Sequence, residues 1–460
     1  MKTTVFEQIS TLVQGIRGAE PDKHQKNILH AHAHYGKFRR FLRILGPGVV
    51  TGAADDDPSG IATYSQTGAA YGYSLLWLFP LMFPLLVSVQ ETCSRIGAVT
   101  GRGLAAVIKA HYNKYLLYMS VFLVVAANVV NIGADLGAMA ATAQLLVPLP
   151  FELLAVLFAL VVILLQIFVK YTTYAKVLKW LALALFAYPI TAFIVGQPWG
   201  TVLSHTVWSH VNIDGATIFL IVGIIGTTIS PYLFFWDTSE VVEDEIATKR
   251  LTSANNTPHL SKVFMKRLRI DNLVGMSLAS VTAWFIVIAC ASSLNASGVT
   301  NIETAADAAK ALEPLVQGFP YAGLIAKLLF SVGIIGIGLL AVPVLAGSSS
   351  YAISEAFGWK EGLYRKFKKA QGFYLVIILA TVAGLTFNFL GIDPIKALLF
   401  AAVFNGIASI PLLWMIARVG NNSEIMGEYK NGRWSNLGIY AAFTLMLGAG
   451  LVLLYSVLVG

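Results

Sequence analysis

The sequence contains little charge and little cysteine. Only 12% of its 460 residues are charged, 57% are hydrophobic, and the mean hydropathy is +0.70. This composition excludes an ordinary water-soluble globular protein and is typical of a chain that crosses a membrane many times. The two cysteines, Cys93 and Cys290, both lie in apolar stretches, which excludes a disulfide framework and a Cys-x-x-Cys metal site.

The first 45 residues lack a long hydrophobic run. Because they are polar and contain many Lys, Arg and His residues, we expect no cleavable signal peptide and assign residues 1–45 to a cytoplasmic N-terminal segment. Residues 46–460 are expected to form one all-α transmembrane domain with about eleven spans. The apolar stretches that predict these spans lie at 46–71, 74–99, 116–146, 149–169, 174–196, 215–243, 271–296, 320–356, 372–391, 394–417 and 436–459.

The basic residues predict the orientation of the spans. If the N-terminus is cytoplasmic, every Lys and Arg except Lys310, Lys327 and Lys396 falls in a segment on the cytoplasmic side. We therefore expect a multi-pass protein of the inner (cell) membrane with its C-terminus outside. The net charge of +8 then reflects topology, so the expected partner is the lipid bilayer and not nucleic acid. We expect the protein to be a monomer.

Three consecutive carboxylates interrupt the first predicted span. Asp55–Asp57 lie within GPGVVTGAADDDPSGIATYSQTGAAYGY, residues 46–73, although one charge at the bilayer centre costs at least about 2.5 to 3.5 kcal/mol. Pro58 and Gly60 follow at once and predict a break in the helix. A broken helix at membrane depth lines a cavity, where freed carbonyls and carboxylates together suit a cation. The alternative is a proline kink whose acids face a water-filled vestibule.

A second break is predicted in the sixth span, at the sequence TTISP, residues 227–231. Pro231 leaves the carbonyl of Thr227 without its usual helical donor, and hydroxyls of Thr227, Thr228 and Ser230 lie beside it. These hydroxyls either face the acids of the first span or bond to carbonyls of their own helix. Sites made of oxygen ligands suit hard cations such as Mg²⁺, Ca²⁺ or Mn²⁺.

The spacing of the two breaks predicts internal symmetry. Interrupted helices five spans apart favour a 5+5 inverted repeat with a binding site between the halves. The repeats are expected at about 46–196 and 215–417, and the span at 436–459 is an addition to them.

Further acids and amides lie in other spans. Asn128, Asn131 and Asp135 share one face of the third span, which predicts either an ion or proton path or a structural network. Asp237 follows the second break and is expected near the exit of the site. Glu91 and Arg95, four residues apart in the second span, are expected to form a helical ion pair. An intramembrane aspartyl protease using Asp57 and Asp135 is not favoured, because the Gly-x-Gly-Asp motif is absent, and we expect no enzymatic activity.

With these motifs in place, the chain from Gly46 onward resembles the NRAMP (natural resistance-associated macrophage protein) family of divalent metal transporters. The resemblance rests on Gly-Pro-Gly with a following Asp57-Pro58, on Asp135-Leu136, on IGTTISP in the sixth span, and on AGSSSYAISEAFGW in the eighth. It implies the leucine-transporter-like fold. It also implies that Asp57 and the carbonyls of Ala54 and Thr227 bind metal, with Ser230 and Gly60 at ligand positions.

This chain departs from the family pattern at several of those positions. Gly60 stands where the family has an Asn ligand, and Ser230 stands where it has a Met sulfur. Tyr232 and Asp237 replace histidines, and Ala138 replaces the Glu of the proton route. In these respects the chain is similar to magnesium-transporting relatives within the superfamily. Loss of the thioether removes a preference for softer metals.

The sequence therefore predicts a secondary transporter that imports a divalent cation, Mg²⁺ or Mn²⁺ ahead of Fe²⁺, with weak or absent proton coupling. Asp57 is the expected central ligand, and Asp56, Asn131, Asp135 and Asp237 are expected to line the ion pathway. No cofactor is expected beyond the transported ion. The alternative is a monovalent-cation transporter or a Na⁺- or H⁺-coupled solute symporter of the same fold, because one Asp with hydroxyls and carbonyls also suits Na⁺.

Overall fold

The structure, a computed structural model, describes residues 47–169, 186–212, 214–248 and 260–459. Within these ranges the chain forms helices joined by turns, without strands. The longer helices are α4 (Pro47–Asp55), α5 (Pro58–Tyr71), α6 (Leu78–Thr100), α7 (Leu104–His111), α8 (Lys114–Gln144), α9 (Phe151–Phe168), α11 (Ala187–Ile194), α12 (Trp199–Val207), α13 (Gly215–Thr228), α14 (Pro231–Ala247), α15 (Lys262–Ser293), α18 (Ala322–Phe357), α19 (Gln371–Phe387), α20 (Pro394–Asn421) and α22 (Arg433–Val459).

The predicted spans coincide with these helices wherever their residues are described. Seven segments of the described chain are long and apolar enough to cross a membrane, and α19 is a shorter apolar helix. Of the span predicted at 174–196, only the end is described, as α11. The N-terminal segment 1–45 lies outside the described residues. Each of the two predicted breaks separates a pair of helices, α4 from α5 and α13 from α14.

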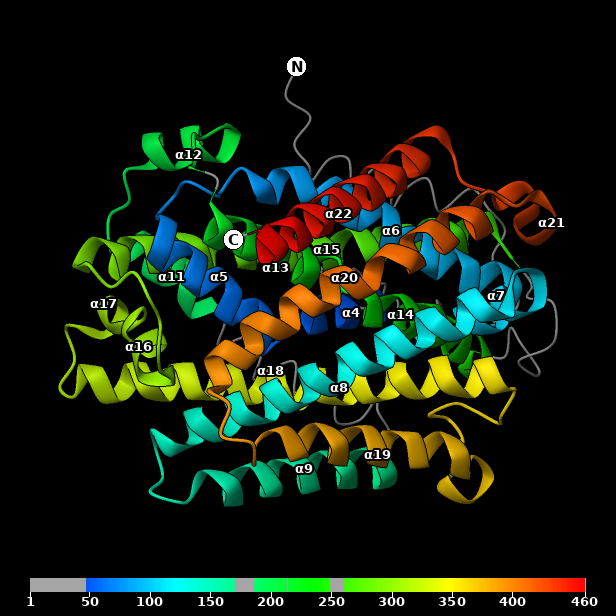
Figure 1. Cartoon of the computed structure of the whole chain (residues 1–460), viewed down its shortest axis with the longest axis horizontal. Helices are drawn as coiled ribbons and strands as arrows, with labels where there is room; N and C mark the ends of the chain where they lie inside the picture. Colours follow the sequence, from blue (N-terminus) through cyan, green and yellow to red (C-terminus); the bar gives the residue numbers. More distant parts are fainter. Residues whose placement is uncertain (1–46, 170–185, 213, 249–259, 460) are drawn as a thin grey trace, which may run out of the picture.

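The two broken spans lie in the middle of the helix bundle (Figure 1). Helices α8 and α18 pack along each other on one side of them, and α9 and α19 pack against this pair on its outer side. On the opposite side α22 lies over α20 and α13. Because α9 presents large apolar side chains such as Leu153, Leu157 and Leu160 to its surroundings, this outer layer suits contact with lipid. The broken spans are thereby shielded from lipid.

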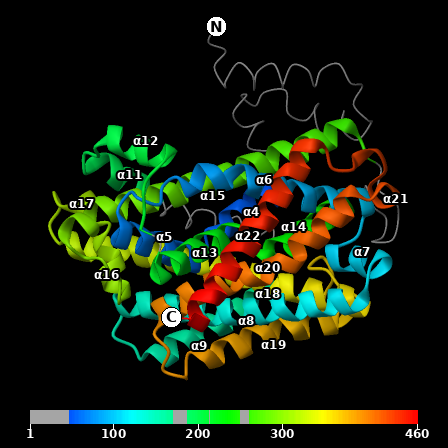
Figure 2. The same cartoon turned by 45° about the horizontal axis from the view of Figure 1, so that its top comes forward.

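Short helices gather at two opposite ends of the bundle. Helix α7 and the short α21 (Ser423–Met426) lie at one end, while α11, α12, α16 (Ala305–Lys310) and α17 (Glu313–Val316) lie at the other (Figures 1 and 2). The described connections that are predicted to be cytoplasmic therefore share one end, and the described connections that are predicted to be external share the other. This division agrees with the predicted topology, and which end faces the cytoplasm stays a prediction.

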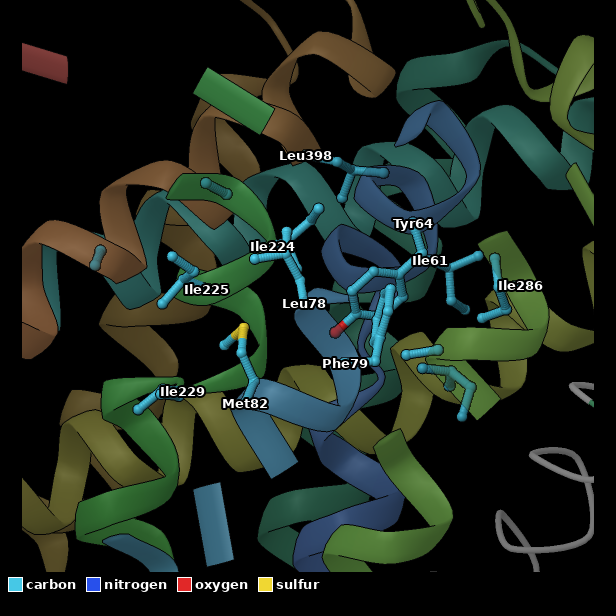
Figure 3. Close-up of a cluster of buried hydrophobic side chains, with 14 of the residues drawn as sticks. Ile61, Tyr64, Leu78, Phe79, Met82, Ile224, Ile225, Ile229, Ile286 and Leu398 are labelled. Carbon is cyan, nitrogen blue, oxygen red and sulfur yellow. The ribbon is translucent and has the colours of Figure 1, made fainter. Parts of the chain in front are cut away.

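An apolar cluster fixes α5 beside α13 (Figure 3). Ile61 and Tyr64 of α5 lie close to Ile224 and Ile225 of α13, and Tyr64 meets Phe79 of α6 edge to face with ring centroids 5.6 Å apart. In a membrane the gain from such packing comes from van der Waals contact between the side chains, because lipid is as apolar as they are. The cluster therefore holds the second half of the first span against the first half of the sixth.

Candidate cation site

The first break is built by Asp57 and Pro58. Helix α4 ends at Asp55, and Asp57, in extended conformation with φ −64° and ψ 170°, is the N-cap of α5 with Pro58 at its first turn. Asp57 Oδ1 accepts hydrogen bonds from the Gly60 amide at 2.8 Å and from Ser59 Oγ at 2.6 Å. A carboxylate is a strong N-cap because it accepts the unpaired amides of the first turn. The predicted break at the acids is confirmed.

At the second break, side-chain hydroxyls donate hydrogen bonds to backbone carbonyls of the same span. Helix α13 ends at Thr228, and Pro231 begins α14 after Ser230. Ser230 Oγ donates to the Thr227 carbonyl at 2.6 Å, so a side chain satisfies the carbonyl that Pro231 leaves without a donor. Thr228 Oγ1 likewise donates to the Ile224 carbonyl at 2.7 Å. These two hydroxyls bond to their own helix, whereas the buried Thr227 Oγ1 has no hydrogen-bond partner among the described residues.

The two breaks face each other. The Tyr232 hydroxyl donates to the Ala54 carbonyl at 2.9 Å and lies 3.5 Å from Asp57 Oδ2. A Cβ placed on Gly60 would lie 3.0 Å from Thr227 Oγ1 and 3.6 Å from Asp57 Oδ1. The Asp57 carboxylate therefore lies inside the gap between the first and sixth spans, together with Ala54, Gly60 and Thr227.

The third span contributes to the same gap. Asn131 Nδ2 of α8 donates to Asp57 Oδ2 at 2.8 Å. Asp135, one turn further along α8, is fully buried, and neither of its oxygens has a hydrogen-bond partner in the described part of the chain. Asn128, one turn earlier, bonds instead to the Leu345 carbonyl and Ser349 Oγ of α18. On the polar face of the third span, Asn128 therefore contacts α18, whereas Asn131 contacts Asp57.

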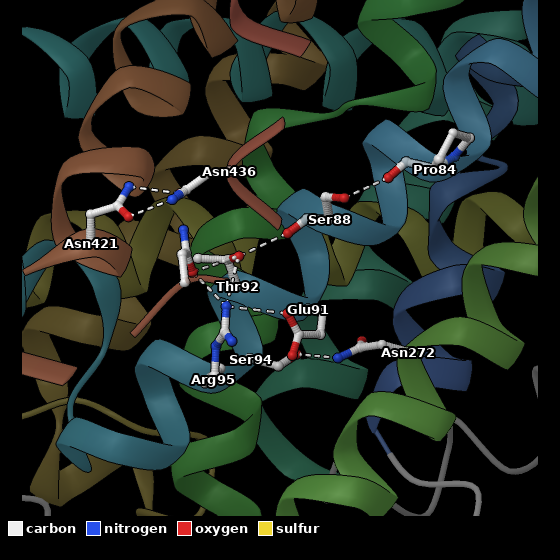
Figure 4. Close-up of polar contacts among 10 residues, drawn as sticks. Pro84, Ser88, Glu91, Thr92, Ser94, Arg95, Asn272, Asn421 and Asn436 are labelled. Carbon is white, nitrogen blue, oxygen red and sulfur yellow. Dashed lines mark hydrogen bonds and ion pairs between the residues drawn. The ribbon is translucent and has the colours of Figure 1, made fainter. Parts of the chain in front are cut away.

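Asp237 belongs to a separate buried network. Its carboxylate accepts from Ser94 Oγ of α6 and from Thr51 Oγ1 of α4 at 3.3 Å. Asn272 Nδ2 of α15 donates to Ser94 Oγ at 2.7 Å, as Figure 4 shows. Asp237 is fully buried and joins four helices, so its hydrogen bonds are those of a structural network. Its expected role at the exit of the site stays a prediction.

The carboxylates of the gap have no basic partner among the residues that the structure describes. Asp55, Asp56, Asp57 and Asp135 are each at most 4% exposed. Among described residues the ion pairs are Glu91–Arg95, at 3.3 Å as predicted, and Asp307–Lys310. Buried charge without a counter-ion is costly, so a cation would stabilise this arrangement.

The gap offers oxygen donors of several kinds. In the parts of the chain that the structure describes, no three His, Cys, Asp or Glu side chains converge as a metal cluster. A cation at Asp57 would instead be held by one carboxylate together with carbonyl, hydroxyl and amide oxygens. Oxygen-only coordination of this kind suits hard cations.

Two contacts of the gap were not foreseen from the sequence. Tyr232 was noted only as a substitute for a family histidine, but its hydroxyl joins α14 to the Ala54 carbonyl. Tyr64, whose hydroxyl lies 3.1 Å from Thr228 Oγ1, was not singled out at all. The available signal was one phenol in the helix after each break, Tyr232 directly after Pro231 and Tyr64 six residues after Pro58.

Comparison with known proteins agrees with this geometry. The chain is 25% identical over 422 residues to the "Divalent metal cation transporter MntH 1" of Pseudomonas aeruginosa, covering 91% of this chain and 92% of the relative. Its fold is similar to that of the Eremococcus coleocola manganese transporter, with TM-score 0.70 at 16% identity over 91% and 87% of the two chains. It is also similar to MhsT in complex with L-phenylalanine, with TM-score 0.55 at 14% identity over 89% and 98%.

These likenesses confirm the predicted all-α, leucine-transporter-like fold. The family described as natural resistance-associated macrophage protein-like matches residues 48–456, nearly the whole described transmembrane region. The chain is thus a multi-pass membrane protein, and it belongs to the Nramp family.

Proposed function

We propose that this protein carries a divalent metal cation across the cell membrane, Mg²⁺ or Mn²⁺ ahead of Fe²⁺, with Asp57 as the central ligand. The observation that carries the proposal is the burial of the Asp57 carboxylate between two facing helix breaks, without a basic partner among the described residues. A relative named as a divalent metal cation transporter, matched over almost its whole length, supports it.

The chemistry of the donors supports a hard cation. The Ala54 and Thr227 carbonyls each accept one hydroxyl, from Tyr232 and Ser230, and each carbonyl oxygen has a second lone pair for an ion. Ser230 presents a hydroxyl where a thioether would favour softer transition metals. Mg²⁺ dehydrates reluctantly and binds through few protein oxygens, which suits a site with one central carboxylate.

The groups around the gap support weak or absent proton coupling. Next to Asp57 stands Tyr232, which does not titrate near neutral pH as a histidine does. On α8 the residue after Gly137 is Ala138, which has no titratable group. Asp135 and Asp237 are two of several buried acids that remain available to a proton path.

The proposed orientation places the N-terminus inside and the C-terminus outside. Lys109, Lys114 and Arg418 lie at the end of the bundle that holds α7 and α21, whereas Asp214 and Glu313 belong to the connections at the other end. Basic residues accumulate on the cytoplasmic side of membrane proteins. Import is then movement from the α16 end toward the α7 end.

Uptake into proteoliposomes tests the proposal. Wild type is expected to take up Mn²⁺, with Mg²⁺ competing more strongly than Fe²⁺, and with little change between two external pH values. Asp57→Ala is expected to abolish uptake. Equal uptake by wild type and Asp57→Ala would overturn the assignment. Calorimetric binding of Na⁺ or K⁺, but not of Mg²⁺ or Mn²⁺, would favour the monovalent-cation alternative.

A further inference from the structure

Only one of the two polar atoms of the Asn131 side chain forms a hydrogen bond within the described residues. Its Nδ2 donates to Asp57 Oδ2 at 2.8 Å, but its buried Oδ1 has no hydrogen-bond partner within the described ranges. Asn131 as a whole is fully buried. A buried amide oxygen without a donor is unfavourable in a folded protein, and such an atom often marks a binding function.

The Asn131 side-chain amide stands in for a side-chain amide that the first span lacks at Gly60. Gly60 has no side chain, and its backbone amide already bonds to Asp57 Oδ1. A Cβ at that position would be crowded by Thr227 Oγ1 at 3.0 Å and by Tyr64 Cε2 at 3.3 Å. A side chain at Gly60 would therefore require Thr227 and Tyr64 to shift, whereas Asn131 brings an amide to the other carboxylate oxygen from α8.

Asp135 strengthens the case for a ligand on α8. It lies one turn beyond Asn131 on the same face, is fully buried, and has two oxygens without hydrogen-bond partners in the described chain. It is close enough to Asp57 for the charges of the two carboxylates to interact. Two ionised carboxylates near each other in a buried site repel, and either a cation beside them or a proton on one of them relieves the repulsion.

We propose that Asn131 is a direct cation ligand. Rotation of its terminal amide, a soft torsion in Asn, moves Nδ2 off Asp57 Oδ2 and brings Oδ1 toward the ion that Asp57 binds. Asp135, one helical turn beyond Asn131 on α8, then supplies a second negative charge near the ion. The site is in this way completed by the third span, because Ser230 of the sixth span directs its hydroxyl to its own helix. This inference rests on the proposed function.

Calorimetry with Mn²⁺ and Mg²⁺ on the full-length protein tests the inference, using wild type, Asn131→Ala, Asn131→Asp, Asn128→Ala and Asp57→Ala. Asn131→Ala is expected to weaken binding of both ions by about tenfold or more. Asn128→Ala removes an equally buried amide that bonds to α18, so it is expected to lower the unfolding temperature while ion affinity stays near that of wild type.

The Asn131→Asp variant distinguishes two roles of Asn131: a direct ligand of the cation, or a group that only positions Asp57. A carboxylate is a stronger ligand for a hard cation, so the ligand role predicts binding at least as tight as in wild type. Once ionised, it cannot donate to Asp57, so a positioning role predicts binding as weak as in Asn131→Ala or weaker. That second result, or wild-type affinity in Asn131→Ala, would overturn the inference. If Asn131→Ala does not fold, Asn131→Asp decides alone.

The same series distinguishes this inference from the proposed function. Equal Mn²⁺ binding by wild type and Asp57→Ala would remove the proposed function and the inference together. Loss of binding in Asp57→Ala with unchanged affinity in Asn131→Ala would remove only the inference, and leave Asp57 with its carbonyl partners as the site.

Discussion

The Asp-Pro dipeptide occurs at two helix starts, and only one of them lies in the candidate site. Asp57 precedes Pro58 at the start of α5, and Asp393 precedes Pro394 at the start of α20. Asp57 Oδ1 accepts from the Gly60 amide at 2.8 Å, and Asp393 Oδ1 accepts from the Lys396 amide at 3.0 Å. The local solution is the same: a carboxylate cap followed by a proline that needs no donor.

The difference lies in the second carboxylate oxygen. Asp393 is partly exposed at the end of the bundle. Asp57 is fully buried, and its Oδ2 faces Asn131 and Tyr232 from two other helices. The comparison teaches that a capping motif becomes a candidate ion site only where the fold surrounds it with further oxygen donors.

The largest effect is expected for Mn²⁺ binding by Asp57→Asn, which distinguishes the charge of Asp57 from its role as a helix cap. Asp57→Asn keeps a good N-cap residue but removes the negative charge, so Mn²⁺ binding should weaken by about 2 to 5 kcal/mol, about 30-fold to several thousand-fold. Asp393→Asn, the matched control, should leave binding and uptake unchanged. Calorimetry and vesicle uptake measure both. A comparable loss in both variants would show that removing the charge of either capping carboxylate is enough, and that the location of Asp57 does not matter.

The next effect concerns ion preference at the second break. Ser230→Met places a thioether beside the Thr227 carbonyl, and should shift the preference between Mg²⁺ and Cd²⁺ toward Cd²⁺ by about tenfold, or about 1.4 kcal/mol. Ser230→Leu has similar bulk without sulfur and serves as the control, because overpacking of this buried position costs about 1 to 3 kcal/mol on its own. Identical selectivity in the two variants would contradict a ligand role at this position.

A smaller effect is expected at the hydroxyl that bridges the two breaks. Tyr232→Phe leaves the buried Ala54 carbonyl without its donor, which should lower metal-free stability by about 1 to 3 kcal/mol. Without the hydroxyl, the Ala54 carbonyl oxygen is free to bind the ion, and Mn²⁺ should bind a few-fold more tightly. Added metal should then restore the unfolding temperature. Tyr64→Phe removes the contact with Thr228 alone and should not gain affinity. Thermal unfolding with and without Mn²⁺ checks both variants.

The smallest effect is the pH dependence of a cap at the surface. Hydrogen bonds from the Thr217 amide and hydroxyl lower the pKa of Asp214, the N-cap of α13, below its usual value. A lowered pKa means that this contribution to stability is present above the unfolded pKa, about 3.9, and is lost as pH falls through the folded value. Asp214→Ala should therefore unfold at a slightly lower temperature than wild type at pH 7, and the gap should close in acid.

The positions of the helices and their breaks could be predicted from the sequence. Apolar runs determine where spans lie, and Pro58 and Pro231 determine where two of them break, because proline lacks the donor that a continuous helix needs. The pairing of Glu91 with Arg95 also followed from their spacing, since residues four apart on a helix are neighbours.

The partners of the site residues could not be predicted in this way. Helical spacing places Asn128, Asn131 and Asp135 on one face, but the crossing of α8 with its neighbours directs Asn128 to α18 and Asn131 to Asp57. The same limit applies to Ser230, whose choice between the ion gap and its own helix depends on a local geometry that several packings allow.

The sequence by itself determined a membrane protein with two interrupted spans and acids stored at one of the interruptions, because hydropathy and proline act locally. Only the tertiary structure decided which oxygens surround Asp57. Tyr232, Asn131 and the Ala54 carbonyl come from different helices, and their distances depend on how side chains such as Ile61, Tyr64 and Ile225 pack the broken spans together. Contacts between distant segments are set by that packing, which no local pattern encodes.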